Sequence, residues 1–289
     1  MIGISHLSKR YRDVIAVDDV TLEIPTGSVC GLLGRNGAGK TTAFKCLLGF
    51  AKPDSGEVRF DGEPLAPHTF IKLGYVPERP ALYGWMTVGQ HLEVVRRTQP
   101  GYDEKFAREL IATFRLDERK RTRRLSKGQQ TAVSLIIALA TRPSLLILDE
   151  PASGLDPVMQ RVVLDLLIDA ATSGATVLLS SHQIGQIDRA ADRVAIMRDG
   201  KIVVSGNLDD LRAASRIVEA TFAGDVPDLS GLEREMRIER VGTSVRAHAN
   251  STADSVAARF GALGAVGVRV LDRSLEDIFL DAVDDGGQS

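Results

Sequence analysis

The chain of 289 residues has little cysteine, few aromatic residues and no long apolar run. Its two cysteines, Cys30 and Cys46, provide neither a disulfide framework nor a metal-ligand spacing. The longest apolar run, residues 133–140, is far shorter than the roughly 20 residues that span a bilayer, so we expect no membrane-spanning helix. The N-terminus lacks a charged start followed by an apolar segment, so we expect no secretory signal. These absences favour a cytoplasmic protein.

The charge balance is ordinary, with a formal net charge of −2 and 26% charged residues, and we expect no nucleic-acid partner. One basic run, residues 115–124, holds six basic side chains. A solvated helix end and loop is favoured over a segment that binds lipid or RNA, because two acids interrupt the run. The length exceeds a typical single domain and predicts one large domain with an appendage, or two domains.

Short apolar runs alternate with helical segments through the first 205 residues, which predicts an α/β fold with a largely parallel sheet. Residues 29–34, 144–150 and 175–181 are the predicted buried strands, and ligands bind at the carboxyl ends of such strands. We expect a core domain of residues 1–206, with a helical subdomain at about 87–140 that begins at Thr87 as N-cap. Residues 207–289 are predicted to be a small α+β accessory domain, with a disordered end at 284–289.

The sequence GRNGAGKT at residues 34–41 has the spacing of a phosphate-binding P-loop. Its glycines let backbone amides close around phosphates, Lys40 reaches the terminal phosphates, and Thr41 offers a hydroxyl to Mg²⁺. The loop follows a predicted strand and precedes a predicted helix, as this chemistry requires. The predicted nucleotide-binding residues are Gly34, Arg35, Asn36, Gly37, Ala38, Gly39, Lys40, Thr41 and Thr42.

Two acids follow the second predicted strand. Asp149 can hold Mg²⁺, and Glu150 can polarise a water for attack on the γ-phosphate. Capping of a following helix is the disfavoured alternative, because PASGLDP rather than a helix follows Glu150. His182, after the third strand, can hydrogen-bond the γ-phosphate, although a lone histidine is more often structural. Hydrolysis of the nucleotide is therefore expected.

Together these motifs resemble the ATP-binding subunit of an ATP-binding cassette (ABC) transporter, closest to the antibiotic and multidrug exporter type. The resemblance covers about residues 2–205 and includes the Walker A loop, the signature motif at 125–129, Walker B at 145–150, the D-loop at 153–156 and the switch histidine His182. It implies a P-loop ATPase core that binds and hydrolyses ATP with Mg²⁺. It also implies that Tyr11 stacks on adenine, with packing on an N-terminal strand as the alternative, and that Asp156 belongs to the nucleotide site.

Two positions depart from the family pattern. The third signature residue is Lys127 where glycine is usual, and Glu78 stands where a glutamine usually contacts the metal and the attacking water. Lysine beside a phosphate site is electrostatically compatible. Glu78 keeps an oxygen for the metal but adds a negative charge, and the resemblance suggests a mark of the exporter-like subfamily. We retain Glu78 as a predicted catalytic and metal-facing residue.

The resemblance also implies an assembly. Ser126, Gly128 and Gln129 of the signature motif would face a nucleotide held by a second ATP-binding subunit, identical or related, so that two chains enclose two ATP molecules. The dimer would drive a separate integral membrane permease, expected to be an exporter, and the permease would hold the chain at the inner face of the cell membrane. A soluble regulatory ATPase not coupled to transport is the alternative.

One apolar and aromatic segment, residues 80–87, has two interpretations. It includes Leu82, Tyr83, Trp85 and Met86, and in the family it borders the groove that receives a cytoplasmic helix of the permease. Packing in the core explains the same pattern equally well, so both interpretations stand.

Overall fold

The computed structural model describes residues 1–214, 216–249 and 252–284. The chain divides into two compact units, Met1–Ser205 and Gly206–Ser289. The boundary expected after residue 206 lies within a strand, β10 (Lys201–Asn207). Among the described residues, no helix combines the length and apolar character that a membrane crossing requires.

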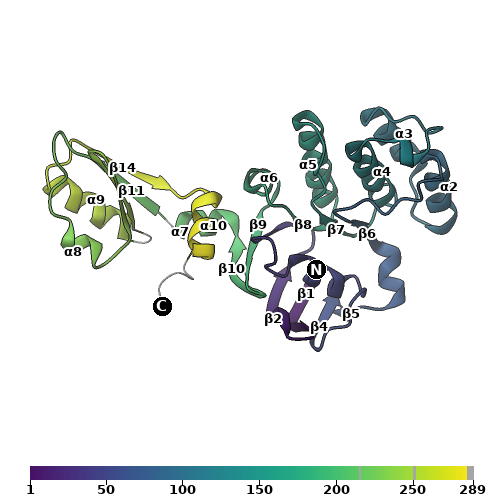
Figure 1. Cartoon of the computed structure of the whole chain (residues 1–289), viewed down its shortest axis with the longest axis horizontal. Helices are drawn as coiled ribbons and strands as arrows, with labels where there is room; N and C mark the ends of the chain where they lie inside the picture. The colour runs from purple at the N-terminus through teal and green to yellow at the C-terminus, as the bar shows by residue number, and fades with distance from the viewer. Residues whose placement is uncertain (215, 250–251, 285–289) are drawn as a thin grey trace. The chain divides into compact units, whose positions relative to one another are not determined.

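Unit 1 contains a six-stranded sheet in the order β10-β9-β3-β8-β7-β6 (Figure 1). From β9 to β6 the neighbouring strands pair in parallel, as predicted for an α/β fold. Every residue of β3, β7 and β8 is buried, which explains why these strands are continuously apolar in the sequence. Besides β10, the strands are β3 (Val29–Leu33), β6 (Leu73–Val76), β7 (Leu145–Asp149), β8 (Thr176–Ser180) and β9 (Arg193–Arg198).

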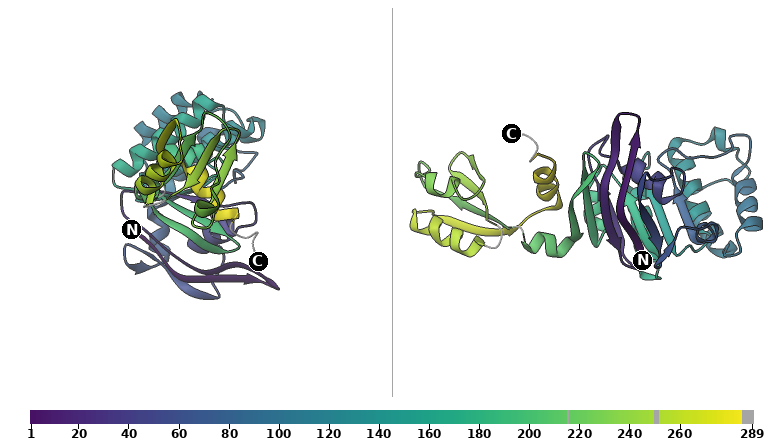
Figure 2. Two further views of the ribbon diagram at one scale, coloured as in Figure 1. Left: turned by 90° about the vertical axis from the view of Figure 1, so that its left-hand side faces the viewer. Right: turned by 90° about the horizontal axis from the view of Figure 1, so that it is seen from below.

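A second, antiparallel sheet was missing from the prediction of a largely parallel sheet. Its order is β2-β1-β4-β5, and the β1–β2 hairpin is long (Figure 2). Ile2, Ile4 and Leu7 of this sheet are buried in one core with Phe44 of the first helix. The sheet therefore covers the helix that follows the P-loop. Its strands are β1 (Ile2–Tyr11), β2 (Val14–Ile24), β4 (Ser55–Phe60) and β5 (Glu63–Pro64).

The helices of unit 1 form two groups. The predicted helical subdomain contains α2, α3 and α4, which cluster together (Figure 1). Thr87 is the N-cap of α2, as predicted, because its Oγ1 accepts a hydrogen bond of 3.2 Å from the Gln90 backbone N–H. The helices of this subdomain are α2 (Val88–Thr98), α3 (Glu104–Thr113) and α4 (Lys127–Leu139); those of the core are α1 (Lys40–Leu47), α5 (Pro157–Thr172) and α6 (Ile184–Ala190).

Unit 2 is α+β, with an antiparallel sheet in the order β12-β13-β11-β14. α9 packs on β11 and β14, and Phe260 is buried against Val218 and Phe222 (Figure 1). Of the end expected to be disordered, residue 284 closes the last helix and residues 285–289 lie outside the described residues. The elements are α7 (Leu208–Ala214), β11 (Arg216–Thr221), α8 (Ser230–Glu233), β12 (Ile238–Val241), β13 (Ser244–His248), α9 (Ala253–Ala262), β14 (Gly267–Asp272) and α10 (Leu275–Asp284).

Candidate functional site

The P-loop connects the buried strand β3 to α1, so it lies at the carboxyl end of a central strand. Ala38 is buried and its backbone N–H donates to the Arg35 carbonyl (3.1 Å), while residues 35–37 between them are exposed. The Lys40 Nζ lies against the loop itself, 2.6 Å from the Gly34 carbonyl oxygen and 3.3 Å from that of Arg35. Thr42, one position beyond Thr41, is half-buried in the same helical turn. The loop thus places an ammonium group at a helix N-terminus, where anions bind.

Gly39 is the position at which the loop requires a glycine. Its φ is +107°, a left-handed conformation that L side chains rarely adopt. A Cβ there would also lie 2.2 Å from the Ala16 carbonyl oxygen in β2. The antiparallel sheet therefore packs directly against the P-loop, which the sequence pattern alone did not reveal.

The two acids of the Walker B strand lie beside the P-loop. Asp149 ends β7 and is 5% exposed; its Oδ2 is 3.5 Å from the Thr41 hydroxyl. Its other oxygen, Oδ1, accepts a 2.5 Å hydrogen bond from the Ser180 hydroxyl of β8. Because Asp149 and Ser180 are register partners in the parallel pair β7–β8, this contact follows from strand alignment. Sequence reasoning missed Ser180; the signal was a polar residue at the end of an apolar run.

Glu150 and His182 contact each other. The His182 Nδ1 is 2.8 Å from the Glu150 Oε2. The Glu150 backbone has a positive φ of 53° and its N–H donates to the Ser180 carbonyl (3.2 Å), which turns the side chain out of the strand direction. A histidine that donates from Nδ1 leaves Nε2 for a second partner, and a ring protonated at both nitrogens donates to two acceptors at once. The His182 ring can therefore bridge the Glu150 carboxylate and a phosphate oxygen.

The charges around Lys40 show which predicted residues gather at the P-loop. Burial lowers the pKa of Lys40, whereas the negative charges of Glu150, Asp149 and Glu78 act in the opposite direction. Glu78 follows β6, beside β7 in the sheet, and its side chain is exposed. The charges of three carboxylates thus act on one ammonium, and a cation bound beside them would offset their repulsion of nucleotide phosphates.

Tyr11 lies at the tip of the β1–β2 hairpin, paired with Val14. Its side chain is 45% exposed, and the Lys9 Nζ lies over the ring, 5.4 Å from the centroid. Ala16, two residues beyond Val14, is the residue that contacts Gly39. The hairpin therefore brings an exposed aromatic ring to the vicinity of the P-loop.

The signature motif lies in a different place, at the start of α4. Ser126 is the N-cap: its Oγ accepts from the Gln129 N–H (3.2 Å), and the Gln129 Oε1 accepts from the Ser126 N–H (3.2 Å). A Cβ on Gly128 would lie 2.6 Å from the Gly154 carbonyl oxygen, so the D-loop packs closely on this turn. The Lys127 Nζ donates to the Ser153 hydroxyl (3.1 Å), which ties the unusual lysine to the D-loop.

A cavity of about 510 Å³ joins the signature motif to the D-loop. Ser126, Gly128, Gln129 and Asp156 line it, and none of its lining residues belongs to the P-loop. The Asp156 Oδ1 accepts hydrogen bonds from Val158 N and Met159 N, both 2.9 Å, and so caps α5. The chain therefore holds two separate clusters of predicted site residues, one around Lys40 and one around Ser126.

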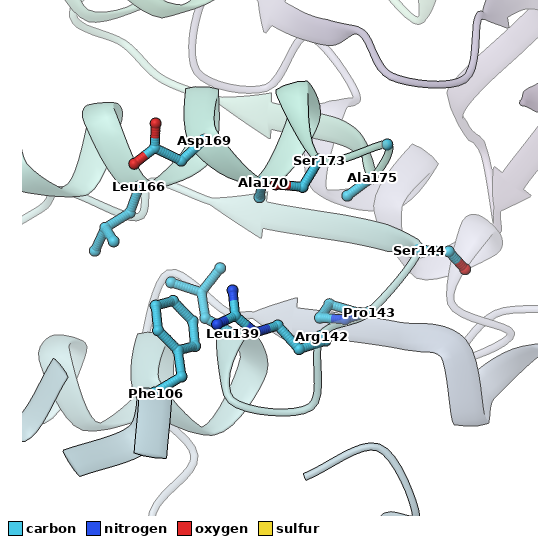
Figure 3. Close-up of a pocket in the computed structure, with 11 residues that line it drawn as sticks. Phe106, Leu139, Arg142, Pro143, Ser144, Leu166, Asp169, Ala170, Ser173 and Ala175 are labelled. Atoms are coloured by element: carbon cyan, nitrogen blue, oxygen red, sulfur yellow. The ribbon is translucent and has the colours of Figure 1, made fainter. Parts of the chain in front are cut away.

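A further cavity, of about 400 Å³, lies between the helical subdomain and α5 (Figure 3). Phe106, Leu139 and Arg142 line one side, and Leu166 and Ala170 of α5 line the other. The Arg142 guanidinium stacks on the Phe106 ring, 3.6 Å from its centroid, which holds the arginine at the cavity edge. The lining thus combines apolar side chains with Asp169 and with Arg142, whose guanidinium also pairs with Asp103 (3.0 Å).

Each of the two interpretations of segment 80–87 describes some of its residues. Met86 is buried and Leu82 half-buried, as in core packing. Tyr83 and Trp85 are 64% and 66% exposed, as at a contact surface. The alternation along this extended stretch explains why one sequence pattern supported both interpretations.

The comparisons with known proteins agree with this geometry. Residues 17–153 match the family described as ABC transporter. The Bacillus subtilis (strain 168) ABC transporter ATP-binding protein YhaQ is 36% identical over 230 residues, which cover 78% of this chain and 77% of that protein. The Nod factor export ATP-binding protein I of Sinorhizobium fredii (strain NBRC 101917 / NGR234) is 32% identical over 298 residues, 96% of this chain and 84% of that protein.

A solved structure of the ATP-binding subunit of an ABC transporter superposes with a TM-score of 0.68 at 31% identity, over 73% of this chain and 92% of that one. The fold and the P-loop site thus define a P-loop ATPase. The chain belongs to the ABC transporter ATP-binding protein family, and it is an ATP-binding, ATP-hydrolysing subunit of a transporter.

Proposed function

We propose that this chain hydrolyses Mg²⁺-bound ATP to drive a separate membrane permease, and that the permease is an exporter. The observation that carries the proposal is the convergence of three strand ends at one point: Lys40 after β3, Asp149 and Glu150 after β7, and His182 after β8. Binding, metal coordination and water activation need these groups within one site.

The residues at this point fit Mg²⁺, because they offer a hydroxyl and carboxylate oxygens. Thr41 and Asp149 would hold it, with Glu78 on the adjacent strand end. Among the described residues, no group of three or more His, Cys, Asp or Glu side chains is placed to hold a metal ion. When bound, Mg²⁺ would offset charge on the β- and γ-phosphate oxygens.

The chain's own residues would then carry out the following steps. Lys40 would turn from the Gly34 carbonyl to the terminal phosphates, and the backbone amides of the loop would cradle them. Glu150 would orient and polarise the attacking water. His182 would hold Glu150 through Nδ1 and donate to the γ-phosphate through Nε2. Tyr11 would stack on the adenine from the hairpin.

We propose that the cluster around Ser126 serves a nucleotide bound by a second ATP-binding subunit. Its cavity is lined by Gly128, Gln129 and Asp156 but by no P-loop residue, which supports action across an interface. Two chains would pack head to tail and enclose two ATP molecules. Loss of the γ-phosphate would remove charge between two helix N-termini and open the dimer.

We further propose that a permease segment occupies the cavity between α3, α4 and α5 (Figure 3). Its lining joins an apolar surface to the charged side chains of Arg142 and Asp169, which suits an amphipathic helix. Such docking would keep the chain cytoplasmic, on the inner face of the cell membrane. The name of the Nod factor export relative, which aligns with nearly the whole chain, supports export.

Two substitutions test the ATPase assignment. Lys40→Ala should abolish tight ATP binding, because it removes the phosphate-facing cation, whereas Glu150→Gln should keep binding and block turnover, because it removes only the polarising carboxylate. Equilibrium binding of ATP and release of phosphate separate the two. Near-normal hydrolysis by the Glu150→Gln chain would show that another group activates the water. Copurification of wild type, but not Phe106→Asp, with a membrane protein tests permease docking.

A further inference from the structure

A row of buried and half-buried polar side chains lies beside Glu150, and the catalytic steps proposed above do not use it. Ser181 is fully buried, and Gln186 in α6 is 8% exposed. The Ser181 hydroxyl donates to the Gln186 Oε1 (2.9 Å), and the Gln186 Nε2 donates to the Gln160 Oε1 of α5 (3.3 Å). Buried polar groups cost stability unless they are paired, so the pairing in this row determines what each side chain can do.

A backbone carbonyl at one end sets the direction of the hydrogen bonds in this row. A carbonyl can only accept, so Gln160 presents its amide nitrogen to the Leu155 carbonyl (3.1 Å). The Gln160 oxygen then faces Gln186, which must donate to it from its own amide nitrogen. The Gln186 oxygen is left for Ser181, so the Ser181 hydroxyl must be the donor.

Gln183, at the start of α6, supports the same orientation. Its side-chain oxygen accepts from the Gln186 Nε2 (2.9 Å), so the Gln186 amide nitrogen has a second acceptor on the side away from Ser181. The Gln183 backbone N–H donates to the Ser181 Oγ (3.1 Å), so that oxygen already accepts one hydrogen bond. A serine hydroxyl has a single proton to donate. In this arrangement the Ser181 proton is therefore committed to Gln186.

The Ser181 proton has a competing acceptor, the carboxylate of Glu150. The Ser181 Oγ lies 3.5 Å from the Glu150 Oε2, the same oxygen that the His182 Nδ1 contacts at 2.8 Å. A carboxylate attracts a hydrogen-bond donor more strongly than a neutral amide does, so Glu150 would take this proton if Gln186 did not accept it. That bond would occupy the carboxylate and weaken its pull on the attacking water.

We propose that Gln186 is a positioning residue for ATP hydrolysis, which keeps the Ser181 hydroxyl from donating to Glu150. The inference rests on the role proposed above for Glu150, the activation of water. With the Ser181 proton held by Gln186, the Glu150 carboxylate serves His182 and the water alone. Gln186 acts through Ser181, so its loss should slow the chemical step and leave nucleotide binding unchanged.

A purely structural role is the alternative, because Gln186 also joins α6 to α5 through Gln160. Such a role predicts a loss of stability, with any loss of activity independent of Ser181. The positioning role predicts a lower kcat at an unchanged KM, and a loss that disappears when the Ser181 hydroxyl is removed. A double-mutant cycle between the two positions therefore separates the two roles.

The test measures ATP hydrolysis and equilibrium ATP binding by the full-length chain. Gln186→Met keeps the length of the side chain but removes the acceptor, and it should lower kcat by about tenfold, the lower end for a hydrogen bond to a charged group. KM and ATP affinity should stay within about twofold of wild type. The matched control is Gln90→Met, because Gln90 occupies the same third position of α2 and also accepts a backbone hydrogen bond through its side chain. The control should change kcat by less than about twofold.

Further variants assign the effect to the Ser181 proton. In a Ser181→Ala chain, the addition of Gln186→Met should change kcat by less than about twofold, because no competing donor remains. Gln186→Glu keeps an oxygen for Ser181 and should retain kcat within about threefold of wild type. Gln160→Met removes the partner that orients the Gln186 amide and should lower kcat by about threefold; it replaces Gln186→Met in the cycle if that chain does not fold. Thermal unfolding shows which variants are folded.

Two results would overturn the proposal. The first is a wild-type kcat in the folded Gln186→Met chain. The second is an equally large loss of kcat when Gln186→Met is added to Ser181→Ala, because Gln186 would then act by packing. Glu150→Gln is measured in parallel: near-normal hydrolysis by that chain refutes the role of Glu150 itself, whereas an inactive Glu150→Gln beside a fully active Gln186→Met refutes only the role of Gln186.

Discussion

We expect Ser126 to have two roles that substitutions can separate. Its hydroxyl caps α4 within its own chain. As proposed above, it also faces the nucleotide bound by a second subunit. Removing that cap with Ser126→Ala should destabilise the chain by about 1 kcal/mol, within a range of roughly 0.5–2 kcal/mol for serine caps. In a unit the size of Met1–Ser205, this corresponds to a fall in Tm of roughly 2–4 °C. The substitution leaves the Gln129 backbone N–H without its acceptor, whereas the Gln129 Oε1 keeps the backbone N–H of residue 126.

Ser126→Asp should separate the two roles. Aspartate caps a helix as well as serine does, so Tm should stay close to that of the wild type. A carboxylate at about 4 Å from a charged γ-phosphate of the second subunit would cost about 4 kcal/mol at an effective dielectric of 20, which is close to a thousandfold in affinity. ATP-dependent dimerisation should therefore be lost although the monomer is stable.

Thr87 provides the matched control, since it caps α2 through the same kind of capping box with Gln90. Thr87→Ala should lower Tm by a similar amount, and Thr87→Asp should leave dimerisation intact. Tm is measured by circular dichroism, and dimerisation by sedimentation velocity with ATP in a Glu150→Gln background. If Ser126→Asp dimerises with ATP as well as Thr87→Asp does, Ser126 does not face the nucleotide of a second subunit.

Three further predictions concern the P-loop site and the division of the chain. Glu78→Gln should leave ATP affinity within a few fold, because a metal-facing oxygen survives; complete loss of hydrolysis would show that the charge itself is needed. Gly39→Ala should destabilise the chain by about 1–3 kcal/mol and weaken nucleotide binding, since its Cβ would lie 2.2 Å from the Ala16 carbonyl. Gly185→Ala in α6, where no atom lies within 4 Å of the added Cβ, is its control and should not reduce Tm. A chain ending at Asn207, the end of β10, should still bind ATP; a folded but non-binding product would contradict the assignment of the accessory domain.

The features that sequence reasoning predicted correctly are local in the chain. The Thr87 N-cap and the buried strands β3, β7 and β8 depend on residues a few positions apart, where turn chemistry and apolar runs are directly readable. The family was recognisable for the same reason, because each motif is a short segment and their order along the chain is preserved.

Contacts between distant segments required the tertiary structure. The hydrogen bond from Ser180 to Asp149 depends on the register of β7 against β8. The close packing of the Ala16 carbonyl against Gly39 depends on a hairpin from the other sheet.

The sequence by itself determined where the P-loop, the paired acids and the helix starts lie, because backbone conformation there is set by neighbouring residues. Only the tertiary structure decided which side chains meet: that Glu150 contacts His182, and that the signature residues line a cavity without the P-loop. It also decided that segment 83–87 pairs with segment 121–123, because such neighbours are fixed by packing between segments that are far apart in the chain.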